Sequence, residues 1–215
     1  MLLTHELVLL SRKTDGGPLI HDLVLDRVLA GALLADLRAA GKIAVSAEGA
    51  VTVLDTTPTG TEVLDSALGP IAGIAPTDVK TAVKNLDDHL GTRTRTDLTG
   101  AGVLHEQSHK TLGLINNTQW APGDPAQHAD LIAHVRACFP DCDGGDEHDR
   151  ALVAFLAASG ALDELIDKAA AAEVADTALA DADPIAAVVR RMVRKRRFAA
   201  AAGASAGGTT GGISS

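Results

Sequence analysis

The stretch HDLVLDRVLAGALLADLRAAGKI, residues 21–43, carries apolar side chains at positions 25, 28, 29, 32 and 33 and polar ones at 36 and 38. Apolar residues that recur three and four positions apart are typical of an amphipathic α-helix with a broad buried face. Gly41 is a residue type that commonly ends such a helix. The stretch therefore predicts a helix that ends near Gly41 and has much of its surface covered.

The flanking sequence extends this helical pattern and adds turns. Residues 42–55 alternate around Glu48-Gly49, which is typical of a β-hairpin, and a second hairpin is expected to turn at Asn116-Asn117. Thr77 is a plausible helix cap. Further helices are predicted before residue 14 and in residues 58–71, 75–90, 125–139, 146–166 and 184–198. The chain is therefore predicted to be mainly α, a single helical domain with two or more β-hairpins over residues 1–198, with a low-complexity, disordered tail at 199–215.

The composition excludes several protein classes. Hydrophobic residues make up 46% of the 215 positions, so the chain can bury a core and is not disordered overall. Its two cysteines, Cys138 and Cys142, do not make a disulfide framework and favour a reducing compartment. The N-terminus lacks the pattern of a signal peptide, and the apolar stretch at residues 151–162 is shorter than the roughly 20 residues that span a bilayer. We therefore expect a cytoplasmic protein that lies peripherally on a membrane surface at most.

Positive charge is concentrated near the C-terminus. The chain carries a formal net charge of −9, yet six of the eight residues at 190–197 are cationic, which leaves −15 for the remainder. Ile185, Val188, Val189 and Met192 form an apolar stripe on the same predicted helix, so we expect its first half to be docked and burial to end near Lys195. A patch of this density attracts nucleic acid or anionic lipid. Its members are Arg190, Arg191, Arg194, Lys195, Arg196 and Arg197.

Five stretches of the chain, taken in order, resemble one known family. They are LLTHELVLL, LAGALLADLRAAGKI, DTTPTGTEVLDSAL, LTGAGVLHE before LGLI, and DRALVAFLAASGAL. The most specific is the third, in which Pro58-Thr59-Gly60 leads into Leu64-Asp65. Together they are similar to the Golgi phosphoprotein 3 family, in a form like its bacterial, Ala-rich members, and the resemblance covers about residues 1–198.

The resemblance implies a helical domain that binds membranes peripherally, since eukaryotic members recognise phosphatidylinositol 4-phosphate at the Golgi. Their headgroup pocket uses a Trp before the second helix, an Arg within it and two Arg before a Gly-Val-Leu element. These positions correspond here to His21, Ala30, Asp88 and Gly91, so none of the four residue types is matched. Nearby arginines are suitable for phosphate contact. The candidate headgroup pocket therefore consists of His21, Arg27, Arg93 and Arg95.

The resemblance also implies a hydrophobic hairpin that inserts into membranes or mediates self-association, which makes a homo-oligomer an expectation. Here it is TLGLINNTQWAP, residues 111–122, with Leu112, Leu114, Ile115 and Trp120. A Trp at the hairpin tip suits a membrane interface, because its ring is apolar and its N–H is polar. The alternative is that alternate side chains cover the core and Trp120 caps it.

Other groups of reactive residues are weaker signals. His134, Cys138, Cys142 and His148 have the spacing H-x₃-C-x₃-C-x₅-H, but Pro140 interrupts it and C-x₂-C motifs are far stronger zinc signals. We interpret the region as an acidic surface loop and expect no metal and no cofactor. Nucleophile, phosphate-loop and dinucleotide motifs are absent from the sequence, so no catalytic residue is assigned and an enzyme is not expected.

Two alternatives to lipid binding remain at this stage. Residues 33–55 have the helix, strand and wing order of a winged-helix DNA-binding protein, but the helix at 21–40 carries only Arg27 and Arg38 as cations. The acidic remainder of the chain would also repel a duplex, so no nucleic acid is expected as a partner. The other alternative is a soluble adaptor that self-associates through the hairpin. We favour a peripheral membrane protein whose partner is anionic lipid, by resemblance a phosphoinositide.

Overall fold

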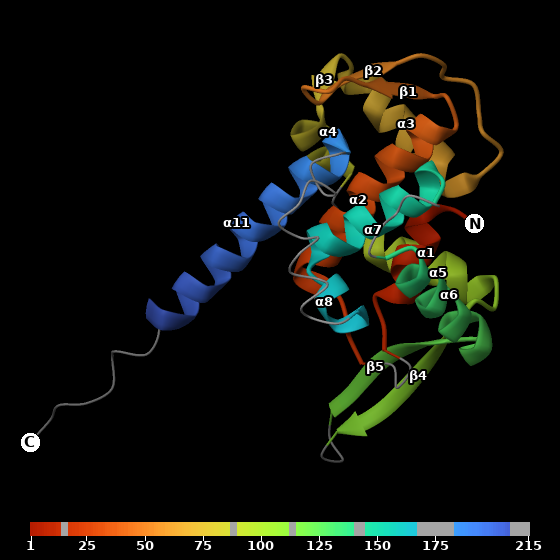
Figure 1. Cartoon of the computed structure of the whole chain (residues 1–215), viewed down its shortest axis with the longest axis vertical. Coiled ribbons are helices and arrows are strands. Elements are labelled where there is room, and N and C mark those ends of the chain that lie inside the picture. Colours follow the sequence, from red (N-terminus) through yellow and green to blue (C-terminus); the bar gives the residue numbers. More distant parts are fainter. Residues whose placement is uncertain (14–16, 87–89, 112–114, 140–144, 167–182, 207–215) are drawn as a thin grey trace, which may run out of the picture.

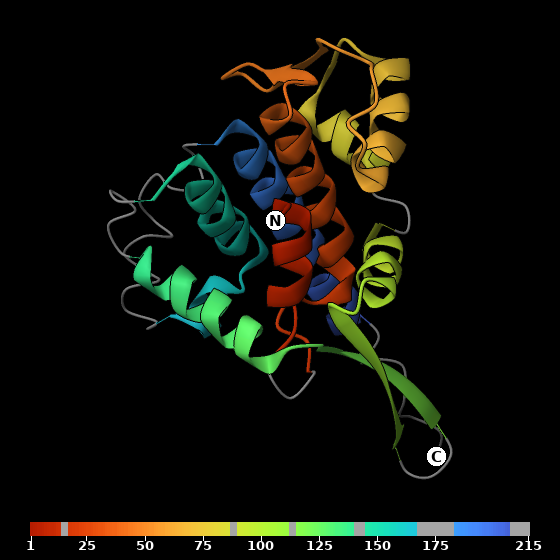
Figure 2. The same ribbon diagram turned by 90° about the vertical axis from the view of Figure 1, so that its right-hand side faces the viewer.

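The computed structural model describes residues 1–13, 17–86, 90–111, 115–139, 145–166 and 183–206. Helix α2 (Asp22–Ala39) runs through the middle of the molecule and the other helices pack around it (Figures 1 and 2). Those in contact with it are α1 (Leu3–Leu10), α3 (Glu62–Ile74), α4 (Val79–Leu86), α5 (Leu90–Gly100), α7 (Glu147–Ser159) and α11 (Pro184–Ala206). Every residue of α2 from Val28 to Leu37 is buried, as the apolar pattern of the sequence predicts.

The close approach of three helices depends on Gly31. A Cβ atom at this position of α2 would overlap the Val189 side chain of α11 and lie 2.8 Å from Cε1 of Phe155 on α7. Both separations are shorter than van der Waals contact, so only glycine permits this packing. Gly31 therefore allows α11, which carries the six cations of residues 190–197 and which we call the basic helix, to pack directly against α2 and α7.

A small sheet covers one end of α2. Strands β1 (Ile43–Val45), β2 (Ala50–Val53) and β3 (Thr77–Asp78) pair antiparallel in the order β1-β2-β3. The hairpin predicted at Glu48-Gly49 is confirmed, and Gly49 has the positive φ of 84° that its turn requires. The predicted cap at Thr77 is wrong: Thr77 lies in β3, and the Asp78 carboxylate accepts from the Thr81 N–H of α4 at 3.1 Å.

A second, longer hairpin projects from the opposite end (Figures 1 and 2). Strands β4 (Leu104–Thr111) and β5 (Ile115–Pro122) pair from Leu104 opposite Pro122 to Thr111 opposite Ile115. The turn predicted at Asn116-Asn117 is therefore misplaced, because both residues lie within β5. Helices α6 (Pro125–Ala137) and α8 (Leu162–Leu165) complete the described elements. The prediction of a mainly α fold with β-hairpins is confirmed.

Helix α11 is longer than the sequence suggested. It continues to Ala206, past the expected domain boundary at residue 198, and its C-terminal part stands away from the body (Figure 1). Residues 207–215 of the expected tail lie outside the described residues. Within the described ranges, no helix combines the length and the apolar character needed to cross a bilayer.

Candidate functional site

Four side chains from distant parts of the sequence meet beside the base of the β4–β5 hairpin. We call them the arginine–tryptophan site: Arg12, Asp22, Arg95 and Trp120. The Nη2 atom of Arg12 and the Nη1 atom of Arg95 lie 2.9 Å and 3.1 Å from the same Asp22 oxygen, Oδ1. The Cζ atom of Arg95 lies 4.6 Å from the centroid of the Trp120 ring, and that of Arg12 lies 5.9 Å from it. Both arginines are therefore cation–π partners of one indole.

Local structure explains how each residue reaches this site. Arg12 follows the end of α1, where the chain turns back and forms an antiparallel bridge with Pro18. Asp22 is the first residue of α2, and α5 is held beside it because the Gly91 N–H donates to Asp26 Oδ1 at 2.6 Å. A Cβ atom on Gly91 would lie 3.7 Å from the Arg95 guanidinium nitrogens. Arg95 thus reaches back along α5 into the space beside Gly91.

The charges of the site do not balance. Two guanidinium groups share the Asp22 carboxylate, so these three ion-paired groups carry one positive charge in excess; the Asp26 carboxylate lies nearby and accepts from the Gly91 N–H. Arg12 and Arg95 are only 5% and 8% exposed, whereas the Asp22 side chain is 65% exposed. Burial lowers the pKa of Arg12, an effect that Asp22 opposes and the nearby Arg95 adds to. The Nε atoms of both arginines are buried and have no hydrogen-bond partner among the described residues. Such a site suits an anion that approaches from the Asp22 side.

Of the four residues of the candidate headgroup pocket, the structure places Arg95 in a defined site. Arg95 belongs to the arginine–tryptophan site, but Arg93 is exposed two residues away on α5 and so points about 200° around that helix. His21 is exposed just before α2, and Arg27 lies about 100° around α2 from Asp26, off the side that holds α5. The stretch that contains Arg93 and Arg95 is helical and forms α5.

Arg12 and Asp22 were missed by sequence reasoning. Arg12 stands in a turn and Asp22 at a helix start, where charged residues are common, and neither belongs to a motif. What marks them is the Asp22 carboxylate, which contacts Arg12 and Arg95 at once. The sequence therefore held no signal that could have identified them.

The hairpin places Trp120 differently from the expectation. Trp120 pairs with Glu106 near the base of the hairpin, not at its tip, and packs against the core. The alternative, that Trp120 caps the core, describes this position. Leu112 and Leu114 lie outside the described residues, and Ile115 begins β5 opposite Thr111.

The apolar stripe predicted on the basic helix packs on the core, but its most buried line is shifted toward Ala186 and Val193. The fully buried side chains of α11 are Ile185, Ala186, Val189 and Val193, while Val188 and Met192 are only partly buried. The contact continues to Arg197, whose Nη2 donates to the Ser159 carbonyl oxygen at 2.7 Å. Val193 is the last buried side chain that the structure describes on α11, in agreement with the expected end of burial near Lys195, and Arg197 adds a hydrogen bond beyond it. That bond gives Arg197 a structural role, because a cation at the C-terminus of α7 complements the helix dipole.

Four exposed side chains occupy the other side of α11. They are Arg191, Arg194, Lys195 and Phe198, at the i, i+3, i+4 and i+7 spacing of one helix face, and we call them the outer face of α11. Phe198 is 70% exposed, which is unusual for so large an apolar side chain. Arg190 and Arg196 are half-buried and do not belong to this face. Of the six cations, four are exposed, and three of these share this face with Phe198.

A groove with a cavity of about 400 Å³ runs along one edge of the outer face. Arg191, Lys195 and Lys80 line it, together with Glu48 and Asp78. Three cations face two carboxylates there, so the local charge is again positive. Arg194 and Phe198 do not line this groove and are the more accessible members of the face.

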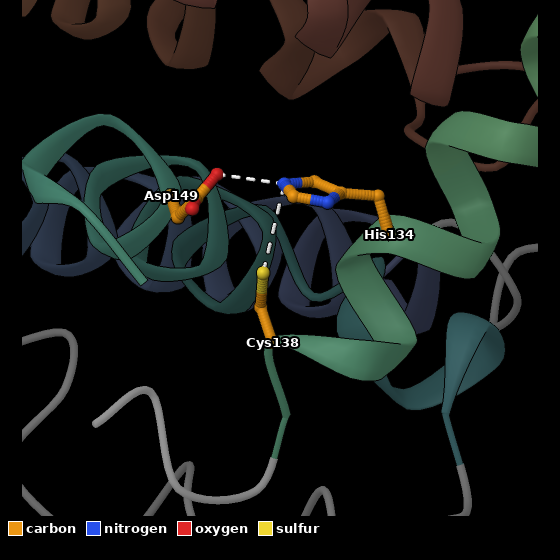
Figure 3. A group of neighbouring side chains, drawn as sticks. All are labelled: His134, Cys138 and Asp149. Atoms are coloured by element: carbon orange, nitrogen blue, oxygen red, sulfur yellow. Dashed lines mark hydrogen bonds and ion pairs between the residues drawn. The ribbon is translucent and has the colours of Figure 1, made fainter. Parts of the chain in front are cut away.

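The structure shows where the described histidine and cysteine residues of the H-x₃-C-x₃-C-x₅-H pattern lie. His134 and Cys138 lie together with Asp149, a residue that the sequence pattern did not include (Figure 3). His148 instead contacts Glu6 of α1, its Nε2 lying 2.8 Å from Oε2, and Cys142 lies outside the described residues. Of the three described residues of that sequence pattern, only His134 and Cys138 lie in one group of ligand atoms.

The α2 helix leaves little room for a DNA-binding role. A recognition helix must present a free face to a groove of DNA. Here the buried run from Val28 to Leu37 occupies every side of α2. The helix that would contact DNA in the winged-helix alternative is therefore buried over residues 28–37.

Comparison with known proteins adds one match. The family model described as Golgi phosphoprotein 3 (GPP34) matches residues 3–196. No curated protein matches the chain. The matched region contains the arginine–tryptophan site and α11 as far as Arg196.

Proposed function

The chain belongs to the Golgi phosphoprotein 3 family, and on that premise we propose that it is a peripheral membrane protein that binds an anionic lipid headgroup. The observation that carries the proposal is the arginine–tryptophan site, in which two buried arginines share one carboxylate beside an indole. The proposal involves no catalytic step. It concerns a cytoplasmic membrane surface, and phosphatidylinositol 4-phosphate is the headgroup that the family relation favours.

The chemistry of the site supports a phosphate ligand. Guanidinium groups bind phosphate through two parallel hydrogen bonds, which a lysine cannot do. Arg12 and Arg95 are oriented before a ligand arrives, because Asp22 holds one end of each and the Trp120 ring contacts both. Preorganisation of this kind reduces the entropy that binding must overcome. A phosphate monoester could thus replace or share the contacts of Asp22.

The outer face of α11 supports attachment to the bilayer itself. Each Lys or Arg near an anionic surface contributes about 1 kcal/mol, and an exposed Phe among cations suits shallow insertion. These side chains lie on the side of α11 opposite to Val189 and Val193, which are buried against the body. The remaining candidate contact is the hairpin tip around Leu112 and Leu114, for which membrane insertion or self-association stays a proposal.

Co-sedimentation with three kinds of liposome tests the proposal. The lipids are neutral, generically anionic, or contain phosphatidylinositol 4-phosphate at matched total charge. We expect binding to both anionic sets with a preference for the phosphoinositide, and Arg95→Gln should abolish that preference. Arg93→Gln is the matched control, because it removes the same charge from the exposed side of the same helix.

A second pair of variants distinguishes the electrostatic attraction of α11 to the bilayer surface from headgroup recognition by the arginine–tryptophan site. Replacing Arg194 and Lys195 by Gln should weaken binding to both anionic liposomes by about thirtyfold, from about 2 kcal/mol of lost attraction. Replacing Lys84 and Arg93, both exposed elsewhere, should leave binding nearly unchanged. Failure to bind any liposome would refute the proposal and direct attention to a soluble adaptor. Equal binding to both anionic liposomes would refute the headgroup assignment alone.

A further inference from the structure

Three potential metal ligands come together where α6 meets α7. We propose that His134, Cys138 and Asp149, the His–Cys–Asp cluster, bind a divalent transition-metal ion of the zinc type. One ligand atom from each residue lies within 4.8 Å of the others (Figure 3). The inference is independent of lipid binding, because none of these residues belongs to the arginine–tryptophan site or to α11.

Secondary structure positions the three side chains. Cys138 is the residue after the end of α6, one helical turn beyond His134, so both side chains lie on the same side of that helix. Asp149 is the third residue of α7, and its Oδ2 accepts from the Asp146 N–H at 3.3 Å as part of a capping box. Its other oxygen, Oδ1, is the one that faces His134. An outer hydrogen bond of this kind orients a metal-binding carboxylate.

Both short contacts of the cluster involve one ring nitrogen. Nε2 of His134 lies 2.7 Å from Asp149 Oδ1 and 3.6 Å from the Cys138 Sγ. A nucleophilic Cys–His–Asp relay needs the thiol on one ring nitrogen and the carboxylate on the other. The observed convergence on Nε2 therefore argues against such a relay.

The convergence of both contacts on His134 Nε2 favours a metal cation between the three side chains. Nε2 carries either a proton, which suits the carboxylate, or a lone pair, which suits a thiol, so it cannot satisfy a neutral thiol and a carboxylate at once. A metal ion at the common centre satisfies the imidazole lone pair, the thiolate and the carboxylate together. These are ordinary zinc ligands, and zinc binding deprotonates the thiol.

Two of the three ligand separations can be compared with those of a tetrahedral site, and the third is within 4.8 Å. Zinc bonds of about 2.0–2.3 Å imply ligand separations of about 3.5 Å for S···N and about 3.4 Å for N···O. The Cys138–His134 separation of 3.6 Å already agrees. Metal binding would require the distance between His134 Nε2 and Asp149 Oδ1 to increase from 2.7 Å by about 0.7 Å. The His134 side chain has room for this movement because it is 52% exposed. That exposure also leaves a fourth position to water.

Cobalt and zinc titrations test the site. Cys142→Ser serves as the background, which keeps the test on the described residues. We expect one Co²⁺ per chain, with tetrahedral absorption and a sulfur-to-cobalt charge-transfer band. Cys138→Ser should remove that band, and each of His134→Ala and Asp149→Asn should weaken Zn²⁺ binding at least about tenfold, measured by competition with a chromophoric chelator. His21→Ala and Asp130→Asn, at exposed positions elsewhere, are the matched controls and should bind as the background does.

Thermal unfolding gives a second readout that does not depend on colour. Zn²⁺ should raise the Tm of the background and of the two controls but not of Cys138→Ser, whose fold a sulfur-to-oxygen change should preserve. The proposal is overturned if Co²⁺ gives only octahedral spectra. It is equally overturned if Zn²⁺ affinity is unchanged by His134→Ala and Cys138→Ser.

Discussion

Replacing Asp22 by Asn should strengthen the binding of an anionic headgroup. Asp22 neutralises half of the positive charge of the arginine–tryptophan site, through one oxygen that contacts both guanidinium groups. In the proposed complex the phosphate occupies the same side of the arginines as this carboxylate. The two anions therefore compete for the same cations, and the amide of Asn removes the competing charge with little change of shape.

The magnitude follows from the exposure of Asp22 and the charge of the ligand. Two unit charges about 5 Å apart interact by about 0.8 kcal/mol at the dielectric constant of water and by about 3 kcal/mol at an effective value of 20. The Asp22 side chain is 65% exposed, so the lower figure is the appropriate one. A phosphate monoester carries about 1.5 to 2 charges, which gives about 1.5 kcal/mol, or roughly tenfold tighter binding.

The assay is the liposome titration with phosphatidylinositol 4-phosphate, performed at low and at moderate salt. Asp97→Asn removes the same charge from an exposed position on α5 and is the matched control. The gain should shrink as salt screens the charges, and it should disappear when Arg95→Gln is combined with Asp22→Asn, as in a double-mutant cycle. Binding by a folded Asp22→Asn variant that is equal to or weaker than that of the unchanged protein would refute the reasoning.

Three further predictions concern stability. Gly31→Ala should lower the free energy of unfolding by about 1–3 kcal/mol, because the new Cβ would overlap side chains of α11 and α7. Gly69→Ala, which has open space around it, should be neutral or stabilising, and urea unfolding of the two variants measures the difference. Arg197→Ala should cost about 1 kcal/mol by removing the donor to the last turn of α7, while Arg194→Ala, which is exposed, should stay within about 0.5 kcal/mol in the same assay. Burial lowers the pKa of His128, so the folded state opposes protonation of this residue and the stability of the protein should fall as pH drops below about 6.5. His128→Gln should flatten that part of a Tm-versus-pH curve, and an unchanged slope would contradict the prediction.

Much of the fold could be predicted from local sequence. The apolar spacing of residues 21–43 was sufficient for α2, and Gly49 was sufficient for the first hairpin, because both depend on interactions within a few positions. The second hairpin was located, but its turn was placed at Asn116-Asn117 on residue preference alone. Cross-strand register decided otherwise, and register depends on which side chains the rest of the fold buries.

Site residues were less predictable, even where their type was noticed. Arg95 was singled out with Arg93, yet only one of them is buried, since the stretch is a helix whose two sides have different neighbours. His134 and Cys138 were grouped with cysteine and histidine neighbours in sequence. Asp149, which lies on the next helix, was overlooked.

The sequence by itself determined the helical class, the central helix, the concentration of cations in one C-terminal helix and the family relation, because each of these is a property of composition or of short-range pattern. Only the tertiary structure decided which charges act together. Arg12, Asp22, Arg95 and Trp120 are brought within contact by the packing of α1, α2, α5 and the β4–β5 hairpin. The physical reason is that such convergence depends on long-range packing, whereas a charged side chain in a turn or a helix looks the same in sequence whether it faces water or a partner.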